Sequence, residues 1–362
     1  MREVQLIREA IAAFELDLTG LTVFTEAATG YFRCTAAIAL AAGAARVLAI
    51  AKSSHHGSIA SARDAVTQLV RELGVERGLS LVDNADQIAE ADIVTNTGFV
   101  RPITDDVVSR MRRDAVIPLM WETWEFRPAD LDLRACLERD ILVLGTNEDD
   151  PRLQTKVLVG VVAERLLQQA EVTIAGAAIV VLGGGVFGSS IGRRLDAMGA
   201  RVSIRCAGPL DGDVAHLRSA VPWRDLVDVS ALVVADHEST HLLVGPAGEL
   251  SVQDLVAANS NLTVVHVSGL IDAPGIRAAG CRLMPGIIAR APRTMSLTTS
   301  YLGPHPVIQL HTAGLRVGQI MARERRRRPT VAAARRSALE DRLCQDFSES
   351  QYAHFQAKTA GS

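Results

Sequence analysis

The sequence predicts an α/β protein with two Rossmann-like lobes, each built on a parallel sheet, and a C-terminal helix that crosses back to the first lobe. Short apolar runs alternate with helical patterns from about residue 20 onward, which is typical of repeated βα units. One apolar run leads directly into a glycine motif, which is typical of a dinucleotide-binding lobe. The 362 residues are enough for two domains, each with its own core.

The first half of the chain contains six apolar runs that are predicted strands. They lie at 21–24, 47–51, 79–82, 93–95, 116–120 and 141–144, and helical patterns lie between them at 58–73, 105–111 and 130–139. A longer helical pattern at 154–170 predicts a connector helix. We therefore expect a substrate lobe over 1–150 and a connector over 151–172.

The second half repeats the βα rhythm. Strands are predicted near 178–182, 202–205, 231–235 and 262–267, and a clear helical period follows at 306–325. We therefore expect a dinucleotide-binding lobe over 173–305, then a crossover helix with a polar tail over 306–362.

Composition narrows the class of protein. Apolar residues make up 48% of the chain and the net charge is −3, so nothing in the charge favours nucleic acid. The arginine run at 323–328 is typical of a solvated helix end. Five scattered cysteines without C-x-x-C spacing, no signal-peptide pattern and no membrane-length apolar run predict a cytoplasmic protein without bound metal or a membrane partner.

The glycine motif lies in Ile-Val-Val-Leu-Gly-Gly-Gly-Val-Phe-Gly, residues 179–188. In a strand–glycines–helix order, Gly183 permits the tight turn, Gly185 lets a pyrophosphate approach the backbone, and Gly188 lets the helix pack closely on the strand. The phosphates then face the helix N-terminus, beside Val186 and Phe187. The alternative is a Rossmann fold that keeps its glycines for packing and binds no nucleotide.

Two further stretches carry a resemblance to known families. The segment 228–237 followed by Glu-Ser-Thr-His-Leu-Leu-Val-Gly at 238–245 is similar to the fourth strand and E-T-x-x-L-I-G stretch of D-2-hydroxyacid dehydrogenases. Thr-Ile-Ala-Gly at 173–176 and Gly-Ala-Arg-Val-Ser-Ile at 199–204 resemble S-adenosylhomocysteine hydrolase. Both families belong to a two-lobed group, so the resemblance implies substrate on the first lobe and NAD on the second.

The chain departs from both families at catalytic positions. The dehydrogenases place an arginine after the strand at 262–267, whereas this chain has His-Val-Ser-Gly-Leu-Ile-Asp at 266–272. Gly286 stands where their catalytic histidine follows a proline. On the connector helix Lys156 matches a lysine of the hydrolase, but Gly160 stands where the hydrolase has an aspartate. The chain is therefore not expected to carry out either the dehydrogenase reaction or the hydrolase reaction with the family's own catalytic residues.

The end of the second Rossmann strand predicts the choice of cofactor. NAD enzymes usually have an acid there to bind the ribose hydroxyls, whereas this chain has Arg205 and Cys206. An arginine can pair with a 2′-phosphate, so the sequence favours NADP over NAD. The alternative is that Arg205 points to solvent and Asp211 or Asp213 reaches the ribose. His237, just past the fourth strand, is expected to contact the cofactor or solvent.

Polar residues follow several strand ends of the first lobe, where ligands bind in parallel α/β sheets. Each has a structural alternative: a turn that only caps the next segment, an exposed loop histidine, or an acid at a helix N-terminus. Proton transfer is assigned to Lys52, His55 or Glu122, together with His266 unless the latter is a satisfied core histidine. The residues expected to bind substrate are Glu26, Asn96, Thr97, Gly98, Glu148 and Lys156.

The sequence therefore predicts an NAD(P)-dependent oxidoreductase that transfers hydride to or from a small oxo, hydroxy or amino acid in a cleft between the lobes. Two alternatives stay open. One is a redox-neutral hydrolase or lyase with tightly bound NAD, and the other is a nucleotide-binding protein without catalysis. A homodimer or homotetramer is expected from the apolar helix faces.

Overall fold

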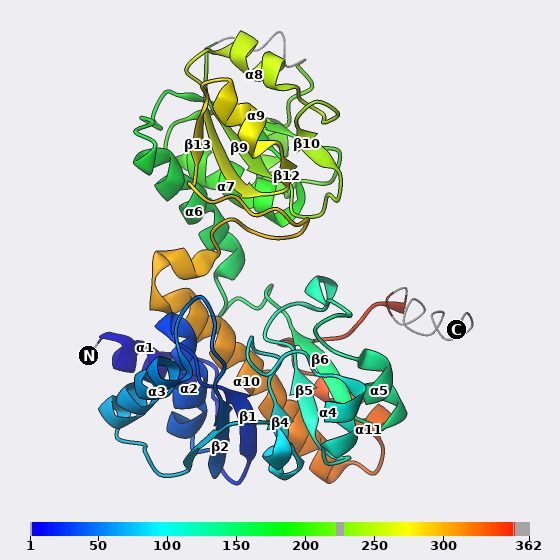
Figure 1. The fold of residues 1–362 in the computed structure, drawn as a ribbon. Helices are drawn as coiled ribbons and strands as arrows, with labels where there is room; N and C mark the ends of the chain where they lie inside the picture. Colours follow the sequence, from blue (N-terminus) through cyan, green and yellow to red (C-terminus); the bar gives the residue numbers. More distant parts are fainter. Residues whose placement is uncertain (1, 222–227, 350, 352–362) are drawn as a thin grey trace. The chain divides into compact units, whose positions relative to one another are not determined.

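The computed structural model describes residues 2–221, 228–349 and 351. The chain divides into two compact units, which we call the first unit (Met1–Leu153 with Gly303–Ser362) and the second unit (Gln154–Leu302). Both are α/β units with sheets that are mainly parallel, as the sequence predicts (Figure 1). Residues 352–362 of the expected polar tail lie outside the described residues.

The sheet of the first unit contains six parallel strands in the order 3-2-1-4-5-6. They are β1 (Thr22–Glu26), β2 (Arg46–Ile50), β3 (Leu79–Val82), β4 (Ile93–Val94), β5 (Val116–Pro118) and β6 (Leu142–Thr146). A seventh strand, β14 (Cys344–Gln345), pairs antiparallel with β6 and was not expected from the sequence. The order reverses between β1 and β4, which makes their carboxyl ends the topological switch point.

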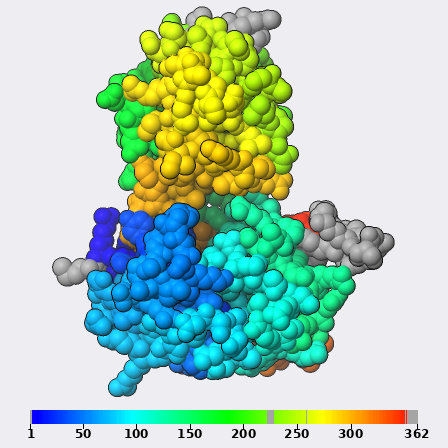
Figure 2. Space-filling view, viewed as in Figure 1, coloured from blue at the N-terminus to red at the C-terminus, as the bar shows by residue number. Residues whose placement is uncertain are grey.

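Helices cover both faces of this sheet (Figure 1). They are α1 (Arg2–Ala13), α2 (Cys34–Ala41), α3 (Ile59–Leu73), α4 (Asp105–Arg110), α5 (Leu133–Glu138), α10 (Pro304–Arg327) and α11 (Val331–Ala338). Because strand residues alternate between faces, Val23 belongs to the core cluster that contains residues of α1, α2, α3, α10 and α11, whereas Phe24 belongs to the cluster that contains residues of α4 and α5. The crossover helix α10 is therefore part of the first unit. On the face of the first unit drawn in Figure 2, earlier residues in blue lie beside later residues in cyan to green.

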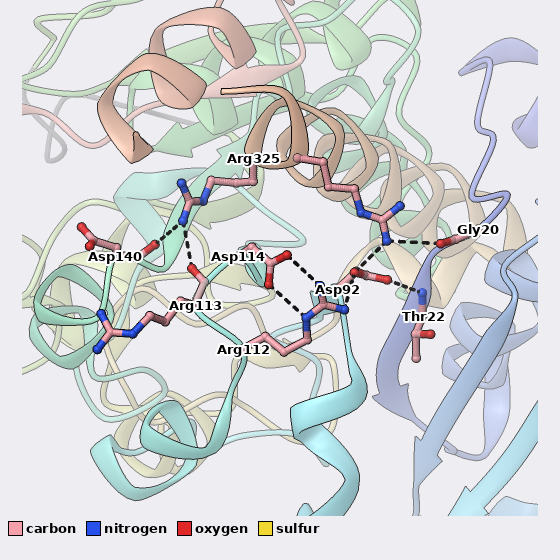
Figure 3. A network of polar contacts seen from close by, with 9 residues as sticks. Gly20, Thr22, Asp92, Arg112, Arg113, Asp114, Asp140 and Arg325 are labelled. Atoms are coloured by element: carbon pink, nitrogen blue, oxygen red, sulfur yellow. Dashed lines mark hydrogen bonds and ion pairs between the residues drawn. The ribbon is translucent and has the colours of Figure 1, made fainter. Parts of the chain in front are cut away.

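The arginine run at the end of α10 is partly the solvated helix end expected from the sequence, since Arg326, Arg327 and Arg328 are exposed, but it also forms specific contacts with the first unit. Asp92, buried just before β4, accepts hydrogen bonds from the Thr22 amide (2.8 Å), Arg112 (3.0 Å) and Arg326 (2.9 Å) (Figure 3). Arg325 donates to the backbone carbonyls of Arg113 and Asp140, at 2.9 and 3.3 Å. The run thus ties the end of α10 to loops at the amino ends of the strands.

His311 on α10 is a buried histidine whose protonation opposes folding. Its Nδ1 lies 2.6 Å from Thr35 Oγ1, and burial lowers the pKa of the imidazole from 6.5 to about 4. The unfolded state therefore binds the proton first, and the stability present above pH 6.5 is lost as the pH falls toward 4. We expect about 1.5 kcal/mol to be lost between pH 6.5 and 5. Urea unfolding at both pH values checks this, and His311→Gln should show a smaller loss.

The second unit has five parallel strands in the order β13-β11-β9-β7-β8. They are β7 (Ala178–Leu182), β8 (Arg201–Arg205), β9 (Val229–Ala235), β11 (Thr263–Ser268) and β13 (Arg282–Met284). A small parallel pair, β10 (Leu242–Val244) with β12 (Leu270–Ile271), stands apart. Beyond β8 a single parallel bridge joins Ile204 to Arg218, where a six-stranded Rossmann sheet would have its third strand.

The helices of the second unit are α6 (Thr155–Gln169), α7 (Gly185–Ala197), α8 (Val252–Ala258) and α9 (Ala273–Ala278). Helix α6, expected as a connector, packs on α7 through Gly160, where a Cβ would lie 2.6 Å from the Ser190 carbonyl oxygen. It therefore belongs to the core of the second unit. No helix within the described ranges combines the length and the apolar character that a membrane span requires.

Candidate functional site

The glycine-rich turn of the second unit has the close backbone approaches that a dinucleotide-binding turn requires. A Cβ on Gly183, whose φ is +134°, would lie 2.5 Å from the Asp236 amide nitrogen at the end of β9. A Cβ on Gly188 would lie 2.2 Å from the Gly183 carbonyl oxygen, so no side chain fits between α7 and β7. Gly185 has φ +58° and begins α7. The turn thus brings a helix N-terminus to the switch point between β7 and β9.

The loop after β8 packs against this turn. The Gly185 amide donates to the Pro209 carbonyl (2.9 Å), and the Asp211 amide donates to Ser189 Oγ (3.0 Å). A Cβ on Gly184 would lie 2.9 Å from the Cβ of Cys206. Cys206 is therefore next to the glycines, as expected for a residue at the second strand end. A phosphate oxygen that accepts from the Gly185 amide would replace the Pro209 carbonyl.

Aromatic and acidic groups border the same turn. Phe187 in the first turn of α7 stacks on His237, with ring centroids 4.6 Å apart, and Val186 beside it is partly exposed. His237 Nδ1 lies 2.9 Å from Ser268 Oγ, which joins the ends of β9 and β11. Glu238 Oε1 lies 3.2 Å from the position of a Cβ on Gly185, so a carboxylate faces the turn.

Arginines dominate the end of β8, where the sequence suggested a preference for NADP. Arg205 donates to the Val221 carbonyl, and Arg218 donates to the carbonyls of Cys206 (3.0 Å) and Gly208 (2.7 Å). The two acids considered as ribose ligands pair instead with Arg193: Asp211 lies at 2.8 Å and Asp213 at 2.6 Å. Arg218 was missed from the sequence, because nothing local places it beside the strand end. Only the bridge from Ile204 to Arg218 does so.

In the first unit the switch point holds a buried polar cluster. Glu26, the last residue of β1, is 4% exposed, and its Oε2 accepts a hydrogen bond from the Phe99 amide at 2.8 Å. Burial raises the pKa of the Glu26 carboxyl to about 7. Thr95 donates to Thr25 Oγ1 at 2.9 Å. The structure therefore brings the ends of β1 and β4 together, as expected for neighbouring parallel strands.

The residues of the predicted turn at 96–98 make different contacts from one another. Asn96 Oδ1 accepts from the Met120 amide at 2.9 Å, and Thr97 Oγ1 lies 3.1 Å from Thr95 Oγ1. A Cβ on Gly98 would lie 3.3 Å from Glu26 Oε2. Asn96 thus ties the end of β4 to the end of β5 through a side-chain-to-backbone hydrogen bond, whereas Gly98 lies against the Glu26 carboxylate.

Cations lie at the same strand ends. Lys52 Nζ donates to the Arg101 carbonyl at 3.0 Å, and burial lowers the pKa of Lys52 against the opposing effect of Glu26. The Arg101 guanidinium pairs with Asp130 at 2.6 Å and lies 5.0 Å from the Trp121 ring centroid. Arg101 was missed because it lies beyond the predicted turn.

His55 is exposed and stacks on His56, which matches the loop-histidine alternative.

Two residues assigned to proton transfer are held by internal hydrogen bonds. Glu122 is buried, with Oε2 accepting from Trp124 Nε1 (2.7 Å) and Oε1 accepting from Gln345 of β14 (3.3 Å). His266 is fully buried, with Nδ1 2.6 Å from Ser296 Oγ and Nε2 2.6 Å from the Gly269 carbonyl. Burial lowers the pKa of His266. Both of its ring nitrogens are used inside the second unit, as in a satisfied core histidine.

The last two predicted substrate residues fall on different units. Glu148 follows β6 in the first unit, whereas Lys156 lies in the first turn of α6 in the second. Across the residues that the structure describes, no group of three or more His, Cys, Asp or Glu side chains could hold a metal ion.

Solved structures share this fold at low sequence identity. D-lactate dehydrogenase with NAD⁺ from Lactobacillus jensenii is 13% identical with a TM-score of 0.52, over 84% of this chain and 97% of that one. The pyruvate reductase of Chlamydomonas reinhardtii is 13% identical with a TM-score of 0.51, over 88% and 99%. No protein-family model and no curated protein matches the sequence. The fold is therefore that of the two-lobed group that the sequence resembles.

Proposed function

We propose that this chain is an NAD(P)-dependent oxidoreductase acting on a small oxo, hydroxy or amino acid, with the cofactor on the second unit and the substrate on the first. One observation carries the proposal: the turn at Gly183 and Gly188 leaves no room for a Cβ and directs the N-terminus of α7 to the switch point. When bound there, a nicotinamide would supply hydride transfer. The structural neighbours named above include a D-lactate dehydrogenase and a pyruvate reductase, which supports this reaction class.

Residues of the second unit would bind the cofactor, and residues of the first unit would bind the substrate. The turn from Gly183 to Gly188 would hold the pyrophosphate, with Phe187 and His237 beside it. In the first unit the end of β1 carries the buried acid Glu26, where the second unit has the glycine turn and the helix N-terminus that suit a pyrophosphate. The cluster around Glu26 and Lys52 would therefore bind the substrate.

The test is nucleotide binding by the purified chain, followed by turnover. We expect NADPH fluorescence to change on binding and a 2-oxo acid such as pyruvate or glyoxylate to be reduced. Denaturing the protein and analysing the released nucleotide distinguishes the proposed oxidoreductase from the redox-neutral alternative. About one NAD per chain would favour a hydrolase or lyase that keeps its cofactor. Binding without turnover of any substrate would favour the non-catalytic alternative, and no binding at all would contradict the proposal.

The two arginines at the end of β8 predict a preference for NADP. We expect Arg218→Ala to weaken NADPH binding by roughly 10-fold and to leave NADH binding within about twofold, since a charge-assisted hydrogen bond to a 2′-phosphate contributes about 1.5 kcal/mol or more. Arg201→Ala is the matched control, because Arg201 lies at the opposite end of β8. Equal losses for both nucleotides would instead show that Arg218 only supports the loop through the Cys206 and Gly208 carbonyls.

A further inference from the structure

The proposed reaction needs a group that exchanges a proton with the substrate, and three sequence candidates are poorly placed for it. His266 has both ring nitrogens in hydrogen bonds within the second unit. Glu122 has both carboxyl oxygens in hydrogen bonds with Trp124 and Gln345. His55 lies exposed on its loop. Proton exchange at a protected site therefore requires another residue.

Glu26 has the geometry that these residues lack. Its side chain is nearly fully buried at the switch point, and the Phe99 amide holds Oε2 at 2.8 Å. Within the described part of the chain, Oε1 accepts no hydrogen bond. One oxygen is thus fixed and the other is available to a ligand. A buried carboxyl of this kind takes up a proton more readily than one in water, and its pKa is raised to about 7.

The charges around Glu26 suit both of its protonation states. Lys52 after β2 and Arg101 after β4 are the cations that act on it, and the Phe99 amide adds a donor, so the carboxylate is stabilised once it forms. Glu26 also acts on the charge of Cys34 on α2, but burial raises the pKa of that thiol well above the usual range, so the thiol stays neutral. Arg101 is already paired with Asp130, whereas among the described residues Lys52 donates to a backbone carbonyl and to no other group. Lys52 can therefore also bind an anionic group.

We propose that Glu26 is the catalytic acid and base of this protein, and that Lys52 binds an anionic group of the substrate beside it. This proposal rests on the proposed function. In the direction of reduction, the O–H bond of the Glu26 carboxyl breaks and a new O–H bond forms on the carbonyl oxygen of the substrate. The electron pair of the carbonyl π bond moves to that oxygen and forms the new O–H bond, and the carbon takes the hydride that a reduced nicotinamide would supply from its C–H bond. Oxidation reverses these changes, with the Glu26 carboxylate accepting the proton.

Infrared titration of the whole chain without nucleotide tests the protonation of Glu26 directly. We expect a carbonyl band of a protonated carboxylic acid that disappears with a midpoint near pH 7 and is absent from Glu26→Gln. Glu90→Gln, at an exposed ion pair with Arg46, is the matched control and should keep the band. A band that persists in Glu26→Gln, or a Glu26 ionised throughout, would overturn the proposal whether or not the protein binds a nucleotide.

Kinetics then tests the catalytic role. Glu26→Gln can still accept from the Phe99 amide but cannot transfer a proton, so we expect kcat for reduction of a panel of 2-oxo acids to fall at least 100-fold. NADPH affinity should not change. The wild-type kcat for reduction should fall above about pH 7, while kcat for oxidation rises, because the two directions use opposite protonation states. Full activity of Glu26→Gln would contradict the role, whereas failure of the wild type to bind NADPH would contradict the proposed function instead.

Discussion

Replacing Asp92 with alanine should lower the free energy of unfolding of the first unit by about 3 kcal/mol. The Asp92 carboxylate is 7% exposed and accepts hydrogen bonds from the Thr22 amide, Arg112 and Arg326 (Figure 3). Its removal leaves the Thr22 amide without this acceptor and two arginines without their buried acid. The arginine side chains are about 40% exposed and can be rehydrated, so we take the lower end of the range for a broken buried pair.

Urea unfolding followed by circular dichroism measures this loss. Asp106→Ala is the matched control, because Asp106 also pairs with an arginine, Arg110, but its side chain is 78% exposed. An exposed pair of this kind contributes about 0.5 kcal/mol or less. Equal effects of the two substitutions would show that the network in Figure 3 does not stabilise the unit. Asp92→Asn should fall between them, since it keeps the shape and loses the charge.

Replacing Gly188 with alanine should weaken nucleotide binding by about 100-fold or more, equivalent to about 3 kcal/mol. The new Cβ would lie 2.2 Å from the Gly183 carbonyl oxygen. Because that oxygen belongs to the backbone, α7 must move away from β7 and carry its N-terminus out of position. The same displacement should destabilise the second unit by about 1–3 kcal/mol.

Fluorescence titration with NADPH and urea unfolding together check this prediction. Gly212→Ala is the control, because a Cβ on Gly212 has nothing within 4 Å and should change neither quantity appreciably. Normal stability and normal NADPH affinity in Gly188→Ala would contradict the close packing of α7 on β7. If Gly188→Ala is less stable but the wild type binds no nucleotide, the packing of α7 on β7 is confirmed. That result would favour the alternative in which the glycines serve packing alone.

The two switch points explain why the units have different proposed roles. Both sheets reverse their strand order beside their first strand, and the carboxyl ends at such a point are where open α/β sheets usually bind ligands. In the second unit that first strand, β7, leads into Gly183 and a helix N-terminus, which suit an anion. In the first unit, β1 ends in Glu26, a buried acid. The first strand thus ends in a buried acid in the first unit and in glycines in the second, although the carboxylate of Glu238 also lies near the second unit's turn.

The sequence by itself determined the α/β class, the glycine turn and the strands of both sheets other than β13 and β14, because these depend on local patterns. An apolar run such as Ala178–Leu182 followed by glycines predicts a strand and a tight turn whatever distant residues pack against it. The positions of Glu26 and Lys52 at strand ends followed in the same way, because parallel strands place their carboxyl ends at one edge.

Only the tertiary structure decided which polar side chains form hydrogen bonds or ion pairs, and with which partners. Gln345 reaches Glu122 from a strand more than 200 positions away, and Arg326 reaches Asp92 from the far end of α10. The partner of His266, the Gly269 carbonyl, is near in sequence, but the backbone after β11 must first turn to present it. Burial and hydrogen-bond partners depend on these long-range contacts, and they distinguish Glu26 from the other candidates. Spacing along the chain carries no such information.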